Sequence, residues 1–146
     1  MFTESITLTG RLRIVLRDAM GVTKEEREFD NLVVTVGKNY TASRMIGTAD
    51  AVMSHMAIGT GTTAAVIGDT ALQTEAGRVV LADSVRTDNA IAYTAVFGTG
   101  VGTGAITEAG ILNAASNGTL LCRTVCPVIN KGADDTLAVT WTVTVN

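Results

Sequence analysis

The sequence predicts a mainly β protein, an antiparallel β-sandwich or barrel of about eight strands with one short α-helix at about residues 35–46. Three observations support this fold class. Runs with period-2 alternation recur along the 146 residues, Gly, Asn and Asp punctuate them, and 23 Thr, 15 Gly and one Pro favour strands and turns. A chain of this length is expected to form a single domain, 1–146, with a core of its own.

The N-terminal segment predicts a hairpin. In residues 6–17 apolar side chains come to alternate with arginines, which is typical of a half-exposed strand. Residues 18–21 read as a turn, and the charged run 22–28 as the returning strand. Because the hairpin is rich in Arg and Glu, residues 1–28 are a candidate arm that projects over a neighbouring subunit.

Residues 35–46 carry the one convincing helical pattern. Val36, Tyr40, Ser43 and Gly47 recur at helical intervals. Thr35 is a candidate N-cap, and Gly47 closes the helix as a C-terminal glycine does.

From residue 52 onward the pattern is strand and turn. The expected strands are 53–58, 78–86, 90–97, 106–112, 120–129 and 137–145, with a short hairpin connection at 87–89 and Gly-rich loops at 59–74 and 98–104. In the last strand Trp141 falls on the apolar face and is expected in the core, while Thr covers the other face. Pro127 marks an edge or a bulge.

Charge and hydropathy exclude several classes of function. The net charge is −3, so there is no basic footprint for nucleic acid or for a membrane surface. Residues 45–146 carry only 12 of the 25 charged side chains, and the mean hydropathy is +0.33 without a run long enough for a membrane span. Either the core is large or other subunits cover some faces. The start of the sequence lacks a secretory signal pattern, so we expect a cytoplasmic site of synthesis.

The sequence contains no pattern typical of a catalytic, cofactor-binding or metal site. Cys122 and Cys126 would lie about 13 Å apart along one strand, too far for a disulfide, and are expected to be small buried residues. His55 has no Asp or Glu in its local sequence and is expected to be structural. The pattern G-x-G-x-x-A at 59–64 lacks the following helix that a dinucleotide site needs.

The tetrapeptide Thr-Glu-Ala-Gly occurs twice, at 74–77 and 107–110, each time after a Gly- and Thr-rich loop and before an apolar run. The repeat permits a paired-carboxylate site at Glu75 and Glu108, but no supporting His or metal ligand accompanies them. We therefore interpret both as junction residues between loop and strand. The loops 59–74 and 98–107 become the expected partner-contact surface, with candidate residues Thr60, Thr62, Thr63, Thr99, Thr103, Glu75 and Glu108.

Three segments together carry a family resemblance: 31–39 (NLVVTVGKN), 53–63 (MSHMAIGTGTT) with 68–72 (GDTAL), and 106–124. With these segments the chain resembles small structural proteins of tailed bacteriophage particles, either capsid decoration (cement) proteins or tail and fibre-attachment proteins.

The resemblance implies a non-enzymatic role in assembly. It implies the major capsid protein or other virion proteins as partners, a homo-oligomer, and a place in the virion assembled in the bacterial host cytoplasm. A carbohydrate-binding β domain is a less favoured alternative, because sugar sites use exposed aromatic side chains and the chain has only six aromatic residues.

Overall fold

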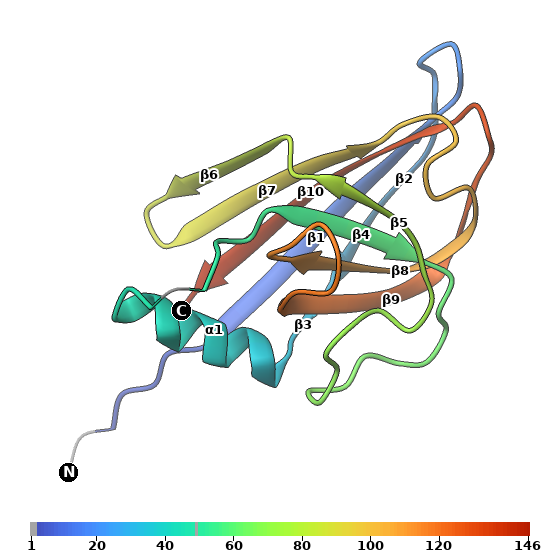
Figure 1. Ribbon diagram of the computed structural model, residues 1–146. Coiled ribbons are helices and arrows are strands. Elements are labelled where there is room, and N and C mark those ends of the chain that lie inside the picture. Colours follow the sequence, from blue (N-terminus) through green and yellow to red (C-terminus); the bar gives the residue numbers. More distant parts are fainter. Residues whose placement is uncertain (1–2, 49) are drawn as a thin grey trace.

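The computed structural model describes residues 3–48 and 50–146 and shows two five-stranded antiparallel sheets packed face to face (Figure 1). Sheet A has the strand order β2-β1-β10-β7-β6, and sheet B has the order β3-β9-β8-β4-β5. The predicted β-sandwich is therefore confirmed. The elements are β1 (Leu8–Arg17), β2 (Thr23–Asp30), β3 (Leu32–Val33), α1 (Thr35–Met45), β4 (His55–Gly59), β5 (Glu75–Val80), β6 (Asp83–Thr87), β7 (Ala90–Phe97), β8 (Gly104–Leu112), β9 (Leu120–Lys131) and β10 (Thr136–Val145).

The main core lies between the two sheets, where the inward-facing side chains of sheet A meet those of sheet B. Leu12 and Trp141 enter it from sheet A, and Ile58 and Ile111 enter it from sheet B, all with 0% exposure. Trp141 thus lies in the core, as its strand pattern predicts. The two cysteines are free, buried thiols, and burial raises the pKa of Cys126 to about 11. Such thiols are poor nucleophiles at neutral pH.

The N-terminal hairpin is part of the sandwich, so the expectation of a projecting arm at 1–28 is wrong for its strands. β1 pairs along its whole length with β10 and also with β2. Its Leu12, Ile14 and Leu16 are buried in the main core. Removing residues 1–28 would delete an interior strand, and we expect unfolding rather than weakened assembly.

The run 78–86, expected as one strand, is two strands in different sheets. β5 belongs to sheet B and β6 to sheet A. The chain crosses between the sheets at Leu81, whose N–H donates to Ser54 O at 2.9 Å, and Ala82, whose N–H donates to Thr94 O at 2.7 Å. The expected hairpin from β6 to β7 is present, and Asp88 in its turn has a φ of 51°.

Helix α1 confirms the predicted segment but not its predicted N-cap. Val34 is the N-cap and has no side-chain cap hydrogen bond; the Thr35 N–H instead donates to Ile67 O at 2.8 Å. At the other end Gly47 has a φ of 66° and donates to Arg44 O at 3.2 Å, as expected of a C-terminal glycine. The first turn of the helix packs on β9, where a Cβ at Gly37 would lie 2.2 Å from Leu121 O.

Pro127 marks a bulge, as predicted. The pairing of β8 with β9 shifts register between Ile106 and Glu108, opposite the part of β9 that contains Pro127. A proline here removes no ladder hydrogen bond from a regular stretch.

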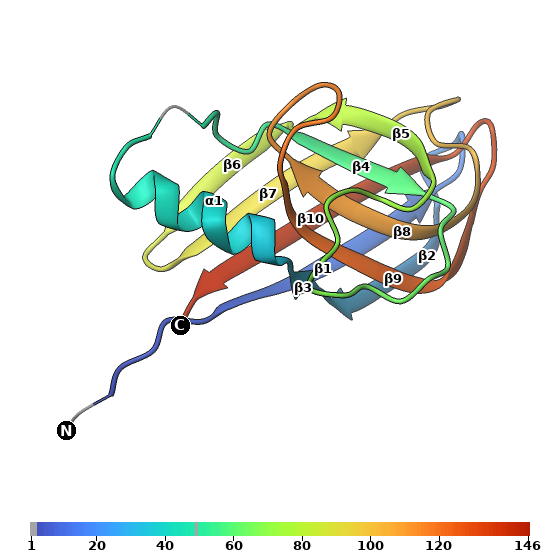
Figure 2. The ribbon, with the colours of Figure 1, turned by 60° about the horizontal axis from the view of Figure 1, so that its bottom comes forward.

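A second apolar cluster lies on the outer face of sheet B, beneath the long loop 60–74 (Figure 2). It consists of Val34, Ala57, Leu72, Leu112 and Leu120. Leu72 comes from the loop itself, so the loop acts as a cover over this face.

Candidate protein-interaction surface

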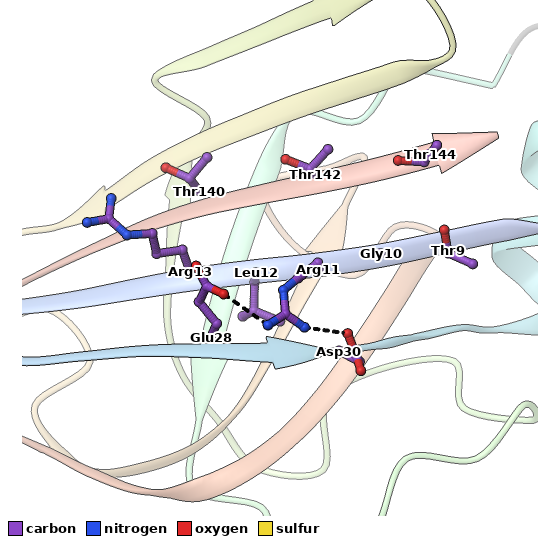
Figure 3. A pocket seen from close by; sticks show the side chains of 10 residues that line it. All are labelled: Thr9, Gly10, Arg11, Leu12, Arg13, Glu28, Asp30, Thr140, Thr142 and Thr144. Carbon is purple, nitrogen blue, oxygen red and sulfur yellow. Dashed lines mark hydrogen bonds and ion pairs between the residues drawn. The ribbon is translucent and has the colours of Figure 1, made fainter. Parts of the chain in front are cut away.

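The outer face of sheet A is a broad open surface, with short side chains on β10 and β7 and longer charged side chains on β1 and β2. We call it the open face and define it by the outward residues of β1, β10, β7, β6 and β2: Thr9, Arg11, Arg13, Thr140, Thr142, Thr144, Ala90, Ala92, Thr94, Val96, Asp83, Val85, Glu26, Glu28 and Asp30. Part of it is a shallow groove along β1, shown in Figure 3.

One row of the open face changes from charged to apolar across the strands, whereas the neighbouring row, Glu28, Arg13, Thr140, Thr94 and Asp83, carries acidic groups at both ends. The first row of directly opposed residues runs Asp30, Arg11, Thr142, Ala92 and Val85, from β2 to β6. Acidic, basic, hydroxyl and apolar groups therefore follow each other in about 20 Å, from the ~4.8 Å spacing of strands. These five residues share one face because directly opposed residues of neighbouring strands point to the same side of a sheet.

Ion pairs line the β2 side of the open face. Arg11 contacts Glu28 and Asp30, each at 2.9 Å (Figure 3). Arg13 Nε donates to Glu26 at 2.8 Å. Hydrogen bonds from Arg11 to these carboxylates, Glu28 first, raise the pKa of the guanidinium, so Arg11 stays charged. About half of each of these arginine side chains is exposed, and such exposed pairs contribute little to stability.

The predicted contact residue Glu108 belongs to the opposite side of the sandwich and is fully buried. Its Oε1 accepts hydrogen bonds from the N–H groups of Gly61 at 3.0 Å and Thr74 at 2.6 Å. Its Oε2 accepts from the Gln73 N–H at 2.9 Å and from Arg123 Nε at 3.0 Å. The prediction that Glu108 is a surface contact is therefore wrong, because four hydrogen-bond donors hold its carboxylate under the loop 60–74.

Arg123 completes this buried network. Its side chain is 2% exposed, and Nη1 lies 2.9 Å from Asp69 Oδ2 while Nη2 donates to Thr63 O at 3.0 Å. Burial works to raise the pKa of Glu108, but the N–H groups of Thr74 and Gln73 together with Arg123 lower it overall. The carboxylate is charged at neutral pH and ties the loop to sheet B.

The two carboxylates of the Thr-Glu-Ala-Gly repeat flank the same residue but differ in environment. Gly59 of β4 is opposed by Glu75 on one side and by Glu108 on the other. Glu75 is exposed at the surface and forms an ion pair with Arg78 at 2.6 Å. Since one member is buried in a complete hydrogen-bond set, the repeat does not present a pair of reactive carboxylates.

The remaining predicted contact residues are exposed, on the loops after β4 and before β8 and, for Glu75, at the first residue of β5. The exposed residues are Thr60, Thr62, Thr63, Thr99, Thr103 and Glu75. Thr107 Oγ1 donates to Gly61 O at 2.7 Å, which joins the start of the long loop to β8. Their role as partner contacts stays a prediction.

No group of three or more metal-ligating side chains occurs within residues 3–48 and 50–146. His55 lies in β4, and its Nδ1 is 2.8 Å from Ser54 Oγ. In that same part of the chain, no helix has the length and apolar character needed to cross a membrane.

No family model, no curated protein and no solved structure matches this chain.

Sequence reasoning missed two parts of this arrangement. The strands of the open face were not recognised as neighbours, although the Thr face of residues 137–145 and the alternating arginines of residues 6–17 are both visible in the sequence. The Glu108–Arg123 pair was missed as well. Its signal was a single arginine inside the apolar run 120–126.

Proposed function

We propose that this protein is a non-enzymatic structural protein of a tailed phage particle, a decoration protein that docks on the major capsid protein through the open face of sheet A. The observation that carries the proposal is the contrast between the two outer faces. Sheet B is covered by the chain's own loop, whereas the groove on sheet A is lined only by sheet residues, such as Arg11, Thr140 and Thr142.

The short side chains of the open face suit docking of another protein. Thr140, Thr142 and Thr144 stand in a line along β10 (Figure 3), beside Ala90 and Ala92 of β7. A partner surface can approach such a face closely, because little side-chain entropy is lost when Thr and Ala are buried. The arginines on the β2 side supply charge complementarity that fixes the orientation of the partner.

A binding experiment tests this function. Purified protein is mixed with capsids prepared without it, and the bound fraction is measured after sedimentation. Saturable binding at a fixed ratio to the capsid subunit is the expected result. Absence of binding at micromolar concentration would contradict the decoration role.

A tail or fibre-adaptor protein is the alternative within the same resemblance. Both roles use a protein-docking face, so the position on the particle separates them. Immunogold labelling over the head favours decoration, and labelling confined to the tail favours the adaptor.

A carbohydrate-binding domain finds less support. Phe97 and Trp141 are fully buried and Tyr93 is 8% exposed, so these rings do not form an exposed platform for a sugar. Binding of the protein to a glycan array would revive this alternative.

A further inference from the structure

The first described residues leave the sandwich as an extended segment. Thr7 exchanges backbone hydrogen bonds with Asn146, at 3.0 and 2.8 Å, and this pair fixes the point of exit. In Figures 1 and 2 the chain then runs away from the body of the sandwich. We call residues 3–6 the N-terminal segment.

A groove lies between the base of this segment and helix α1. Ile6, Thr7 and Leu8 line one side, and Lys38, Thr41, Ala42 and Met45 line the other. The helix side of the groove has Lys38 at one end and Met45 at the other, spaced i and i+7 along one face. At 1.5 Å per residue this wall is about 10 Å long.

The groove region is unusually apolar for an exposed surface. The groove residues Ile6 and Met45 are 70% and 78% exposed, and Ile46, which follows Met45 in the chain, is 80% exposed. Among the residues that the structure describes, these are three of the four large apolar side chains with at least 70% exposure, and the fourth is Met20. Clustered exposed apolar groups of this kind mark an interaction site.

We propose that two copies of this chain exchange their N-terminal segments, each segment lying in the α1 groove of the other copy. The chain's own Ile6 stays 70% exposed beside the groove, so its own segment does not fill it. A reciprocal exchange about a two-fold axis uses the same contact twice and closes at a dimer.

The segment matches the groove in charge and spacing. Glu4 and Ile6 lie on the same side of an extended chain, about 7 Å apart. Glu4 of one copy can therefore contact Lys38 of the other while Ile6 packs on Ala42 and Met45. Within the described part of the chain neither Glu4 nor Lys38 forms an ion pair of its own.

Disulfide trapping between two different chains tests the exchange. A chain with Ile6→Cys is mixed with a chain with Ala42→Cys under mild oxidation, and the control mixture replaces the second chain by one with Ser116→Cys, on the exposed loop after β8. A cross-linked heterodimer in the first mixture well above the control is expected, together with a wild-type dimer by analytical ultracentrifugation.

Three results would overturn the proposal. A monomeric wild type, or a dimer whose two chains do not cross-link above the control, would overturn the proposal. A monomer of the double variant Ile6→Cys/Ala42→Cys that forms only an intrachain disulfide would show that the segment occupies its own groove, and would overturn it as well.

Charge reversal gives an independent readout. Glu4→Lys and Lys38→Glu should each weaken the dimer several-fold, and the double variant should recover most of the wild-type dissociation constant. Equal constants in all four proteins would contradict the proposed contact. None of these measurements involves a phage particle, so failure here leaves the docking function of the open face to be judged separately.

Discussion

The two outer faces of the sandwich use charged residues in opposite ways. On sheet B, Glu108 and Arg123 are buried under the loop 60–74, and their bonding capacity is used by each other and by loop groups. On sheet A, Arg11 and Arg13 make exposed ion pairs with carboxylates of β2. Buried charges must be fully paired to be tolerated, whereas exposed pairs can rearrange cheaply. One face is therefore closed by the chain's own loop, and the other remains open.

Removing the buried carboxylate of Glu108 tests this difference between the two faces with the largest expected effect. Glu108→Ala leaves Arg123 buried beside unpaired loop N–H groups, and we expect a loss of about 3–5 kcal/mol in the free energy of unfolding. Urea denaturation measures it. The matched control is Glu75→Ala, on the other side of Gly59, which should cost no more than about 1 kcal/mol. Equal losses would show that the two junction carboxylates are equivalent after all.

Crowding the same carboxylate from the loop side should have a smaller effect. A Cβ at Gly61 would lie 2.5 Å from Glu108 Oε1, whereas a Cβ at Gly68 would meet nothing within 4 Å. Gly61→Ala should therefore destabilise the fold by about 1–3 kcal/mol. The control is Gly68→Ala, and thermal melts of the two variants are compared. An unchanged unfolding midpoint for Gly61→Ala would mean that the loop shifts to accommodate the added Cβ without loss of stability.

The buried carboxylate also predicts a dependence on pH. Its pKa is lowered from 4.5 in the folded protein, so its stabilising contribution is present above pH 4.5 and is lost as the pH falls through the folded pKa. The stability difference between wild type and Glu108→Gln should be constant near neutral pH and shrink in acid. Denaturation series at several pH values measure this difference. A difference that grows on acidification would contradict the assigned direction.

The smallest effect belongs to the open face. A double-mutant cycle on Arg11→Ala and Glu28→Ala should give a coupling energy of about 0.2–1 kcal/mol, because both side chains are about half exposed. Raising the salt concentration should reduce it further. A coupling of several kcal/mol would make the open face as structural as the covered one.

Much of the fold follows from local sequence. The alternation around Trp141, the Gly47 helix stop and the Pro127 bulge each depend on a few neighbouring residues, and each is where the pattern places it. Local signals fail where the fold depends on distant pairing. The interior position of β1 requires β10 from the far end of the chain. The crossing at Leu81 has no Gly or Pro to mark it.

The candidate surfaces were harder to predict for the same reason. Arg123 interrupts an apolar run, which signals a buried partner, but its partners Glu108 and Asp69 are distant in sequence, and the closure of the loop decides which of them it meets. The open face combines strands from both ends of the chain. Alternation shows that Thr142 faces outward, but not that Arg11 and Ala92 are its neighbours.

One measurement tests the central claim most directly, that the open face docks and the covered face does not. Thr142→Arg places a long charged side chain in the middle of the open face, and Thr70→Arg places the same side chain on the exposed loop over sheet B. Both variants are first shown to keep the wild-type unfolding midpoint, and their binding to capsids prepared without the protein is then compared. We predict at least about a tenfold loss of affinity for Thr142→Arg, roughly 1.4 kcal/mol, and wild-type binding for Thr70→Arg. Full binding by Thr142→Arg with loss of binding by Thr70→Arg would contradict the account.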